Sequence, residues 1–266
     1  MRIITPELLD FLRKKGLKVA ETPGWQGRGK ELPGKPLGAL CHHTAGPKDG
    51  NMPSLQTLIN GRPDLPGPLA QFGPGRDGTV YVVADGRANH AGIGEWHGIT
   101  MGNSFMIGIE AENTGLPEDS PWPKVQIEAY NQLCAALAEW FGWSADANDT
   151  RPADHIAGHK EYALPHGRKS DPDFDMPPFR DAVQGLIDGT IPAPTPIPPV
   201  DPTTGYPTLR RGATGDPVRV VQAKVGVTVD GNFGAKTEAA VRQFQRDHNL
   251  VPDGIVGPKS WALINE

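Results

Sequence analysis

Cysteine and long apolar runs are both scarce in this sequence of 266 residues. Cys41 and Cys134 are its only two cysteines, too few for the disulfide framework of a small secreted scaffold. We expect both to be buried thiols, because a free cysteine packs as a small apolar side chain. No stretch approaches the roughly 20 apolar residues that cross a bilayer. The sequence therefore predicts a soluble globular protein with no membrane insertion.

Positive charge is not in excess either. The formal net charge is −5, which argues against nucleic acid as a partner. Residues 1–20 predict a short amphipathic helix, but they lack the apolar core and the small-residue cleavage site of a secretory signal. We therefore expect synthesis in a cytoplasm, whichever compartment the protein acts in later.

Proline, in contrast, is concentrated in residues 191–202 (IPAPTPIPPVDP). Such a run favours extended polyproline geometry and predicts a spacer between domains. The formal charge changes across it, from −6 in residues 1–190 (18 basic against 24 acidic) to +2 in residues 208–266 (8 basic against 6 acidic). We predict a large domain at 1–190, a linker at 191–207 and a small domain at 208–266.

The small domain contains a repeat with a period of 23 residues. Arg219 recurs as Arg242, and the pair at 230–231 (DG) recurs at 253–254. Each copy predicts an apolar helix followed by a turn that opens the next helix, which gives three helices in all. The expected core consists of Val218, Val221, Val225, Phe233, Val241, Phe244, Trp261 and Ile264.

Three segments of this domain resemble the three-helix type of peptidoglycan-binding domain. They are residues 209–212 (LRRG), 241–245 (VRQFQ) and 253–257 (DGIVG). The resemblance implies attachment to the bacterial cell wall, with peptidoglycan as the partner. A purely structural helical bundle is the alternative.

Strands and helices alternate irregularly in residues 1–190. Residues 37–43, 79–83 and 105–112 have the composition and alternation of strands. Residues 125–141 place their apolar side chains on one helical stripe. This mixture predicts an α/β domain, a mixed sheet flanked by helices.

Histidine and aspartate stand in positions that suggest a metal site. His42 lies at the end of the first of these strands, and His159 and Asp171 lie on one distant loop. If the fold brings them together, two His and one Asp leave a zinc coordination position open for water. His155 with His159 is a second possible pair, but no Glu follows His155, and Gly158 disfavours a helix there.

The same residues resemble the zinc-dependent N-acetylmuramoyl-L-alanine amidases, a family that includes peptidoglycan recognition proteins and phage lysins. The family pattern is an apolar strand ending in His, a strand ending in I-G-I-E, and a G-H…K-x-D-P loop. Here these are residues 40–45 (LCHHTA), 107–110 (IGIE), 158–159 (GH) and 169–172 (KSDP). The resemblance extends over about residues 37–176.

This resemblance implies Zn²⁺ as cofactor, with His42, His159 and Asp171 as its ligands. His42 is preferred over His43 because the family's ligand directly follows the apolar strand. Neighbouring side chains of a strand point to opposite faces, so only one of the two can serve. The loop between His159 and Asp171 is longer than in many relatives, which leaves His166 as a reserve ligand.

The resemblance also implies two catalytic roles. Glu110 would act as the general base that takes a proton from water and passes it to the leaving amine. Lys169 would stabilise the oxyanion that develops on the substrate. Glu112, on the same strand face, is an alternative base, and a surface lysine is the alternative for Lys169.

A glycine-rich segment, residues 90–98, predicts contacts to substrate. His90 belongs to a motif, residues 87–92, that resembles a family segment lining the substrate cleft. Trp96 offers an aromatic face for stacking on sugar or peptide. Trp96 as an anchor of its own loop is the alternative.

The function implied is that of a peptidoglycan hydrolase that cuts the amide between N-acetylmuramic acid and the L-alanine of the stem peptide. A wall-binding repeat without a signal favours a monomeric phage endolysin, made in the host cytoplasm and released by a holin. Residues 51–55 and 61–63 look most like lysins of actinobacterial phages. A non-catalytic recognition protein, a host autolysin and a muropeptide-recycling amidase are the alternatives.

Overall fold

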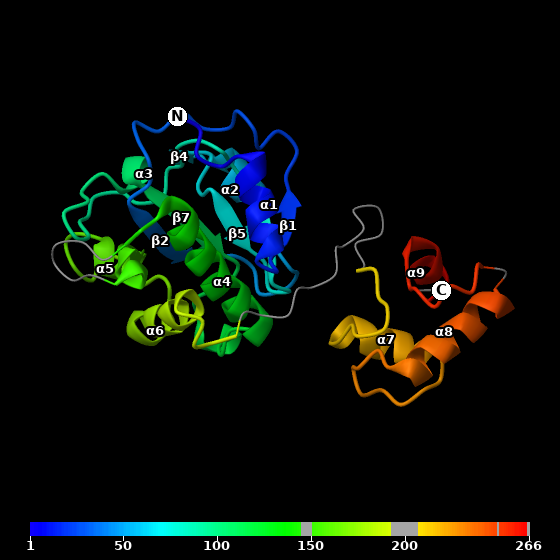
Figure 1. The fold of residues 1–266 in the computed structure, drawn as a ribbon. Coiled ribbons are helices and arrows are strands. Elements are labelled where there is room, and N and C mark those ends of the chain that lie inside the picture. Colours follow the sequence, from blue (N-terminus) through cyan, green and yellow to red (C-terminus); the bar gives the residue numbers. More distant parts are fainter. Residues whose placement is uncertain (145–150, 193–206, 249, 265–266) are drawn as a thin grey trace. The chain divides into compact units, whose positions relative to one another are not determined.

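The computed structural model describes residues 1–144, 151–192, 207–248 and 250–264 (Figure 1). The chain divides into two compact units, Met1–Thr195 and Pro196–Glu266. Most of the predicted linker, residues 191–207, lies outside the described residues. The predicted domain limits therefore stay a prediction.

The larger unit is built on a six-stranded mixed sheet. Across the sheet the strands are β1 (Lys18–Glu21), β6 (Thr79–Val82), β5 (Phe72–Pro74), β7 (Met106–Ala111), β2 (Gly38–His43) and β8 (Ile156–Gly158). Strands β7, β2 and β8 run parallel, whereas β5 and β6 are antiparallel. A separate hairpin joins β3 (Gly61–Arg62) to β4 (Leu65–Pro66).

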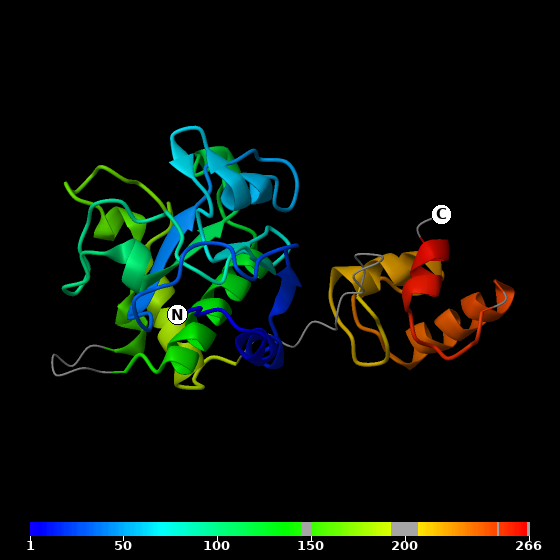
Figure 2. The same cartoon turned by 90° about the horizontal axis from the view of Figure 1, so that it is seen from above.

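Three helices cover one face of this sheet: α1 (Pro6–Lys14), α4 (Lys124–Phe141) and α6 (Met176–Ile187) (Figure 1). The shorter helices α2 (Leu55–Asn60), α3 (Gly102–Phe105) and α5 (His159–Tyr162) belong to the other face, where Figure 2 shows α2 with the β3–β4 hairpin. Two 3₁₀ turns are η1 (Pro117–Asp119) and η2 (Pro152–His155). The predicted α/β class is confirmed. None of the described helices combines the length and apolarity needed to cross a membrane.

Alternation along the strands decides which side chains face the helices. Ala39 and Cys41 of β2 lie in the core beneath α4, whereas Leu40 belongs to the opposite face. By the same period of two, His42 and Glu110 face away from α4. Parallel strands end at one edge of a sheet, and ligands bind there in open α/β sheets. We therefore expect the active site at the carboxyl edge of β2, β7 and β8.

The predicted elements differ from the observed ones mainly at the N-terminus. The helix predicted within residues 1–20 ends at Lys14, because Gly16 turns the chain with φ of 90° and residues 18–21 form β1. The Thr5 side chain accepts a hydrogen bond from the Leu8 amide and caps the start of the helix. The predicted helix at 125–141 is confirmed as α4, which ends at the left-handed Gly142.

Helix α4 holds the end of the central strands through one buried hydroxyl. The Tyr130 hydroxyl accepts from the His42 amide at 3.0 Å and donates to the Ile109 carbonyl at 2.9 Å. Cys41 and Cys134 are free, buried thiols beside it, with their sulfur atoms 4.0 Å apart. The prediction for both cysteines is confirmed, and Tyr130 ties β2 to β7 where His42 lies.

The smaller unit consists of α7 (Asp216–Lys224), α8 (Ala235–Asp247) and α9 (Pro258–Ile264), as the repeat predicts. Seven of the eight predicted core residues are buried, Val225 is partly buried, and Leu209 and Val256 complete the cluster. The repeat has a polar centre that the sequence did not reveal as such. The side-chain amides of Gln222 and Gln245 each donate to an aspartate (2.7 and 2.8 Å) and accept from the next glycine amide (2.8 and 2.9 Å).

Removing the Tyr130 hydroxyl should destabilise the larger unit. Tyr130→Phe leaves the buried His42 amide without this acceptor, and we expect a loss of about 1–3 kcal/mol in the free energy of unfolding. Tyr81→Phe is the matched control, because Tyr81 is only half-buried and its hydroxyl bonds to the Asn51 side chain. Urea unfolding followed by circular dichroism measures both variants. Equal losses would contradict the role of Tyr130.

Candidate active site

Three of the predicted site residues meet at the carboxyl edge of the sheet. His42 lies near the end of β2, His159 starts α5 directly after β8, and Asp171 lies in the loop before α6. One Asp171 carboxylate oxygen, Oδ2, is 3.0 Å from the Nδ1 atom of each histidine, and the two Nδ1 atoms are 3.0 Å apart. Among the described residues these are the one group that could hold a metal ion.

The donor set fits a cation. His159 Nε2 lies 3.0 Å from the Ala91 backbone oxygen, and a carbonyl only accepts, so this nitrogen carries the ring proton. If His159 Nδ1 carries no proton of its own, its lone pair therefore points at the Asp171 carboxylate. Lone pairs in such proximity repel each other unless a positive charge lies between them. Two imidazoles and one carboxylate are a usual ligand set for zinc with an open fourth position.

The protonation states also suit metal binding. Burial lowers the pKa of His42 to about 4, although Asp171 acts to raise it. Burial acts to raise the pKa of Asp171, but its close contacts with His159 and His42 outweigh it and hold that pKa below its usual range. At neutral pH the site thus contains a neutral His42 imidazole and an ionised carboxylate, the forms that bind metal.

Glu110 lies beside this group, opposite His42 in the register of β2 and β7. Its Oε1 is 3.9 Å from His42 Nδ1, and its buried Oε2 has no hydrogen-bond partner among the described residues. Burial and the charge of Asp171 raise the pKa of Glu110 well above its usual value, and the charge of Lys169 opposes them. The exposed Lys169 therefore lies near enough to act on the site electrostatically.

Glu112, the alternative base, has its carboxylate occupied by other groups. It is fully buried and accepts from the Ser54 amide (2.9 Å), the Ser54 hydroxyl (3.0 Å) and the Thr44 hydroxyl (2.7 Å). These bonds hold the segment after β2 to the end of β7. Glu110 is thus the carboxylate that faces the metal-ligand group, and Glu112 is a structural clamp.

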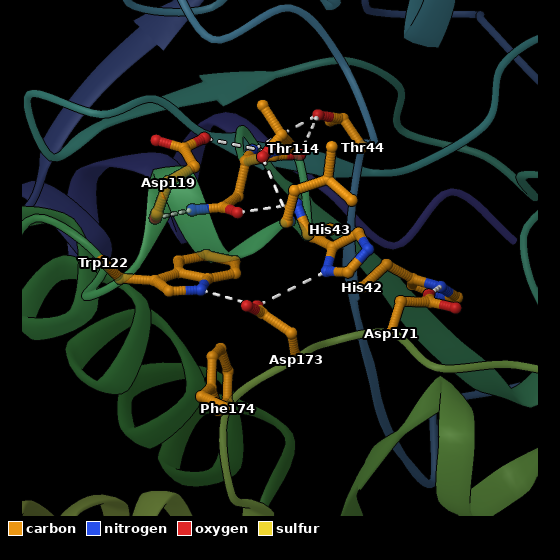
Figure 3. A network of polar contacts seen from close by, with 12 residues as sticks. His42, His43, Thr44, Thr114, Asp119, Trp122, Asp171, Asp173 and Phe174 are labelled. Atoms are coloured by element: carbon orange, nitrogen blue, oxygen red, sulfur yellow. Dashed lines mark hydrogen bonds and ion pairs between the residues drawn. The ribbon is translucent and has the colours of Figure 1, made fainter.

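His43 points away from His42, as the strand alternation predicts (Figure 3). Its Nδ1 lies 3.6 Å from Asp173, which also accepts the Trp122 indole N–H at 2.7 Å. His43 therefore pairs with Asp173 one layer away from the pair of His42 and Asp171. The hydrogen bond from Trp122 to Asp173 fixes the loop that carries Asp171, whereas His43 Nδ1 has no hydrogen-bond partner among the described residues. Sequence reasoning missed the contact between His43 and Asp173. The signal was the spacing: His42 and His43 are adjacent, and Asp171 and Asp173 are only two residues apart.

His90 lies beside the candidate metal ligands. It is 8% exposed and lies behind His42, with its Nδ1 atom 3.2 Å from His42 Nε2 and the two rings edge to face. Burial lowers the pKa of His90 well below its ordinary value, so the ring is neutral at neutral pH. His90 therefore lies next to His42, a candidate metal ligand, and its contact with substrate stays a prediction.

Trp96 has the contacts of the loop-anchor alternative. Its indole N–H donates to the Asp154 carbonyl at 2.8 Å, and the Arg180 guanidinium lies over its ring at 5.3 Å. Arg180 is held in turn by Glu161 at 2.7 Å. The half-buried Trp96 thus connects its glycine-rich loop to η2 and α6.

The two remaining histidines of the metal prediction lie elsewhere. His166 is exposed and does not belong to the metal-capable group found in the described part of the chain. His155 bonds to the Leu37 carbonyl, next to the amino end of β2, and residues 156–158 form a strand. His155 and His159 therefore do not share a helix face, as expected.

Two family models match this chain, one in each unit. A family model described as N-acetylmuramoyl-L-alanine amidase matches residues 33–174. A second model, described as a putative peptidoglycan binding domain, matches residues 218–264.

Individual relatives match parts of the chain. The 1,6-anhydro-N-acetylmuramyl-L-alanine amidase AmpD of Enterobacter cloacae is 35% identical over 106 residues, 39% of this chain and 51% of that protein. A zinc D-Ala-D-Ala carboxypeptidase of Streptomyces albus G is 39% identical over 65 residues, 21% of this chain and 26% of that protein. The chain thus spans about half or less of these curated relatives. The solved N-acetylmuramoyl-L-alanine amidase LysC from Clostridium intestinale matches with 20% identity and a TM-score of 0.43, covering 64% of this chain and 97% of that one.

Weakening the Glu112 clamp should destabilise the fold around the site. Glu112→Gln replaces an accepting oxygen with a donating amide NH2 group that faces the donors of Ser54 and Thr44, and we expect a loss of about 1.5–3 kcal/mol in the free energy of unfolding. Glu118→Gln, at an exposed carboxylate, is the control. Urea unfolding measures the loss, and hydrogen exchange at the Ser54 amide locates it. If the two variants are equally stable, Glu112 is not a clamp.

Proposed function

This chain belongs to the N-acetylmuramoyl-L-alanine amidase family, and we propose that it is a zinc-dependent peptidoglycan hydrolase. The bond cut is the amide between N-acetylmuramic acid and the L-alanine of the stem peptide. The convergence of His42, His159 and Asp171 beside Glu110 supports this most strongly. A non-catalytic recognition protein is the second candidate, but such proteins typically lack one of the ligands, and all three are present here.

The proposed cofactor is held by three side chains of the chain. His42 and His159 would bind Zn²⁺ through Nδ1 and Asp171 through Oδ2, the atoms that face one another. A zinc ion bound there supplies Lewis-acid polarisation of a carbonyl and lowers the pKa of water.

The chain's own groups then move protons and stabilise charge. Glu110, with a raised pKa and an unpartnered oxygen among the described residues, is suited to take a proton from the attacking water. The same carboxyl group can return that proton to the leaving amine of L-alanine. Lys169 provides a positive charge at the edge of the candidate active site, where it stabilises the substrate carbonyl oxygen as that oxygen becomes negative.

The smaller unit is proposed to attach the enzyme to peptidoglycan. Its formal charge of +2, against −6 for residues 1–190, suits a wall polymer with carboxylates in its stem peptides. We further propose that the protein is a monomeric phage endolysin that reaches the wall from the host cytoplasm after holin action. The pairing of an amidase domain with a wall-binding domain supports this over a recycling amidase, because soluble muropeptides need no tether. A host autolysin is the remaining competitor.

Mass spectrometry of digested, purified cell wall tests the reaction. We expect stem peptides with a free L-alanine amino terminus, and one equivalent of zinc in the purified protein by elemental analysis. New reducing sugar ends would identify a glycosidase instead. Bound zinc without release of stem peptides would favour the recognition protein.

Glu110→Gln should separate catalysis from metal binding. The variant removes the proton acceptor but no proposed ligand, so we expect zinc content and fold to persist while turnover falls roughly 10²–10⁴-fold. His159→Ala is the contrasting variant, because it removes a ligand and should lose zinc and turnover together. Turnover near the parent's in Glu110→Gln would assign the base to another group.

Deleting residues 191–266 should weaken hydrolysis of intact cell wall but not hydrolysis of soluble fragments. The truncated protein retains the site, so we expect unchanged hydrolysis of soluble muropeptides. Sedimentation with insoluble wall should show binding roughly 100-fold weaker, since tethering raises the local concentration of the catalytic unit. Wall binding equal to that of the full chain would refute the targeting role of the smaller unit.

A further inference from the structure

The two histidines of the proposed zinc site share one short segment behind them. His42 Nε2 lies 3.2 Å from His90 Nδ1, and His159 Nε2 lies 3.0 Å from the Ala91 backbone oxygen. His42 and His159 are 117 positions apart in the sequence, yet their outer nitrogens meet adjacent residues. One segment can therefore set the orientation of both rings.

The contacts also select the ring tautomers. The Ala91 carbonyl can only accept, so His159 carries its proton on Nε2 and leaves Nδ1 free to bind metal. His42 has its Nδ1 free only if its Nε2 carries the proton and donates to His90. A neutral His90 can accept that bond through Nδ1. The partner across the bond thus decides whether His42 can act as a ligand.

A single side chain fixes this segment to the sheet. The Asn103 side-chain oxygen accepts from the His90 amide and from the Ala91 amide, both at 2.8 Å. Asn103 belongs to α3, which leads directly into β7. On the other side the His90 ring packs against Gly108, where an added Cβ would lie 2.6 Å from ring atoms. This explains why glycine stands in the I-G-I-E motif.

We propose that His90 is a positioning residue of the metal centre and that Asn103 holds it in place. His90 accepts from His42 Nε2, fixes the tautomer that presents Nδ1, and does not bind substrate. The proposal rests on the zinc site put forward above. Outer partners of this kind typically change metal affinity 10- to 100-fold when they are removed.

Two substitutions at His90 separate hydrogen bonding from packing. His90→Leu removes the acceptor but fills about the volume of the ring, whereas His90→Asn keeps an oxygen near the place of Nδ1 although its side chain is smaller. Competition with a chromophoric chelator gives the Zn²⁺ dissociation constant, and the Co²⁺ absorption spectrum reports the ligand geometry. We expect roughly 10- to 100-fold weaker zinc binding and an altered Co²⁺ spectrum for His90→Leu, and values close to the parent's for His90→Asn.

Opposite outcomes overturn the proposal in distinct ways. Parental affinity in a folded His90→Leu removes any positioning role, and equal losses in both variants mean that packing, not the accepted hydrogen bond, matters. If the parent itself binds no zinc, the proposed function fails first. Thermal melting of the metal-free proteins checks folding.

A second pair keeps the test decisive if His90→Leu does not fold. Asn103→Leu removes the oxygen that holds the amides of residues 90 and 91, whereas Asn103→Asp keeps it. Asn103 is only half-buried, which favours folding of both variants. We expect weaker zinc binding in Asn103→Leu alone, and unchanged binding there would overturn the role given to Asn103.

Discussion

The parallel register of β2, β7 and β8 is the constraint on which the rest of the site depends. It sets His42 opposite Glu110 and Cys41 opposite Gly158, so that three distant segments end at one edge. A slip of one residue would turn His42 toward α4 and bring the wrong histidine to the site. Main-chain hydrogen bonds therefore decide which side chains can react together.

Around this edge, well-bonded buried residues surround the candidate site residues, some of whose polar atoms lack suitable hydrogen-bond partners in the described part of the chain. The nitrogen and oxygen atoms of His42, His159 and Asp171 that could bind a metal face each other, and Glu110 has a buried oxygen unpartnered in the described structure. Tyr130 and Glu112, by contrast, have several close partners each and lie next to these groups. Tyr130 and Glu112 therefore keep the reactive groups close together. Such stabilising neighbours are expected where the requirements of function oppose local stability.

The sequence indicated the fold class, the central strands, α4 and the helical repeat, because all of these follow from periodicity. Alternation showed that only one of His42 and His43 could serve as a ligand, and the family resemblance selected His42. Alternation did not show that His159 and Asp171 return to the same edge, which required the family resemblance. The part played by His90 stayed hidden, since its position depends on an amide oxygen of Asn103 and on the space left by Gly108. The bond between His159 and the Ala91 backbone oxygen could not be predicted from residue types, because every residue has a backbone carbonyl.

Because of that backbone bond, His42 and His159 differ in how sensitive their outer partners are to mutation. The outer partner of His159 is a main-chain oxygen, which every residue type at position 91 would still provide. The outer partner of His42 is a side chain, which a single base change can delete. One half of the proposed metal site would therefore keep its outer partner after any substitution at position 91, whereas the other half depends on the single side chain of His90.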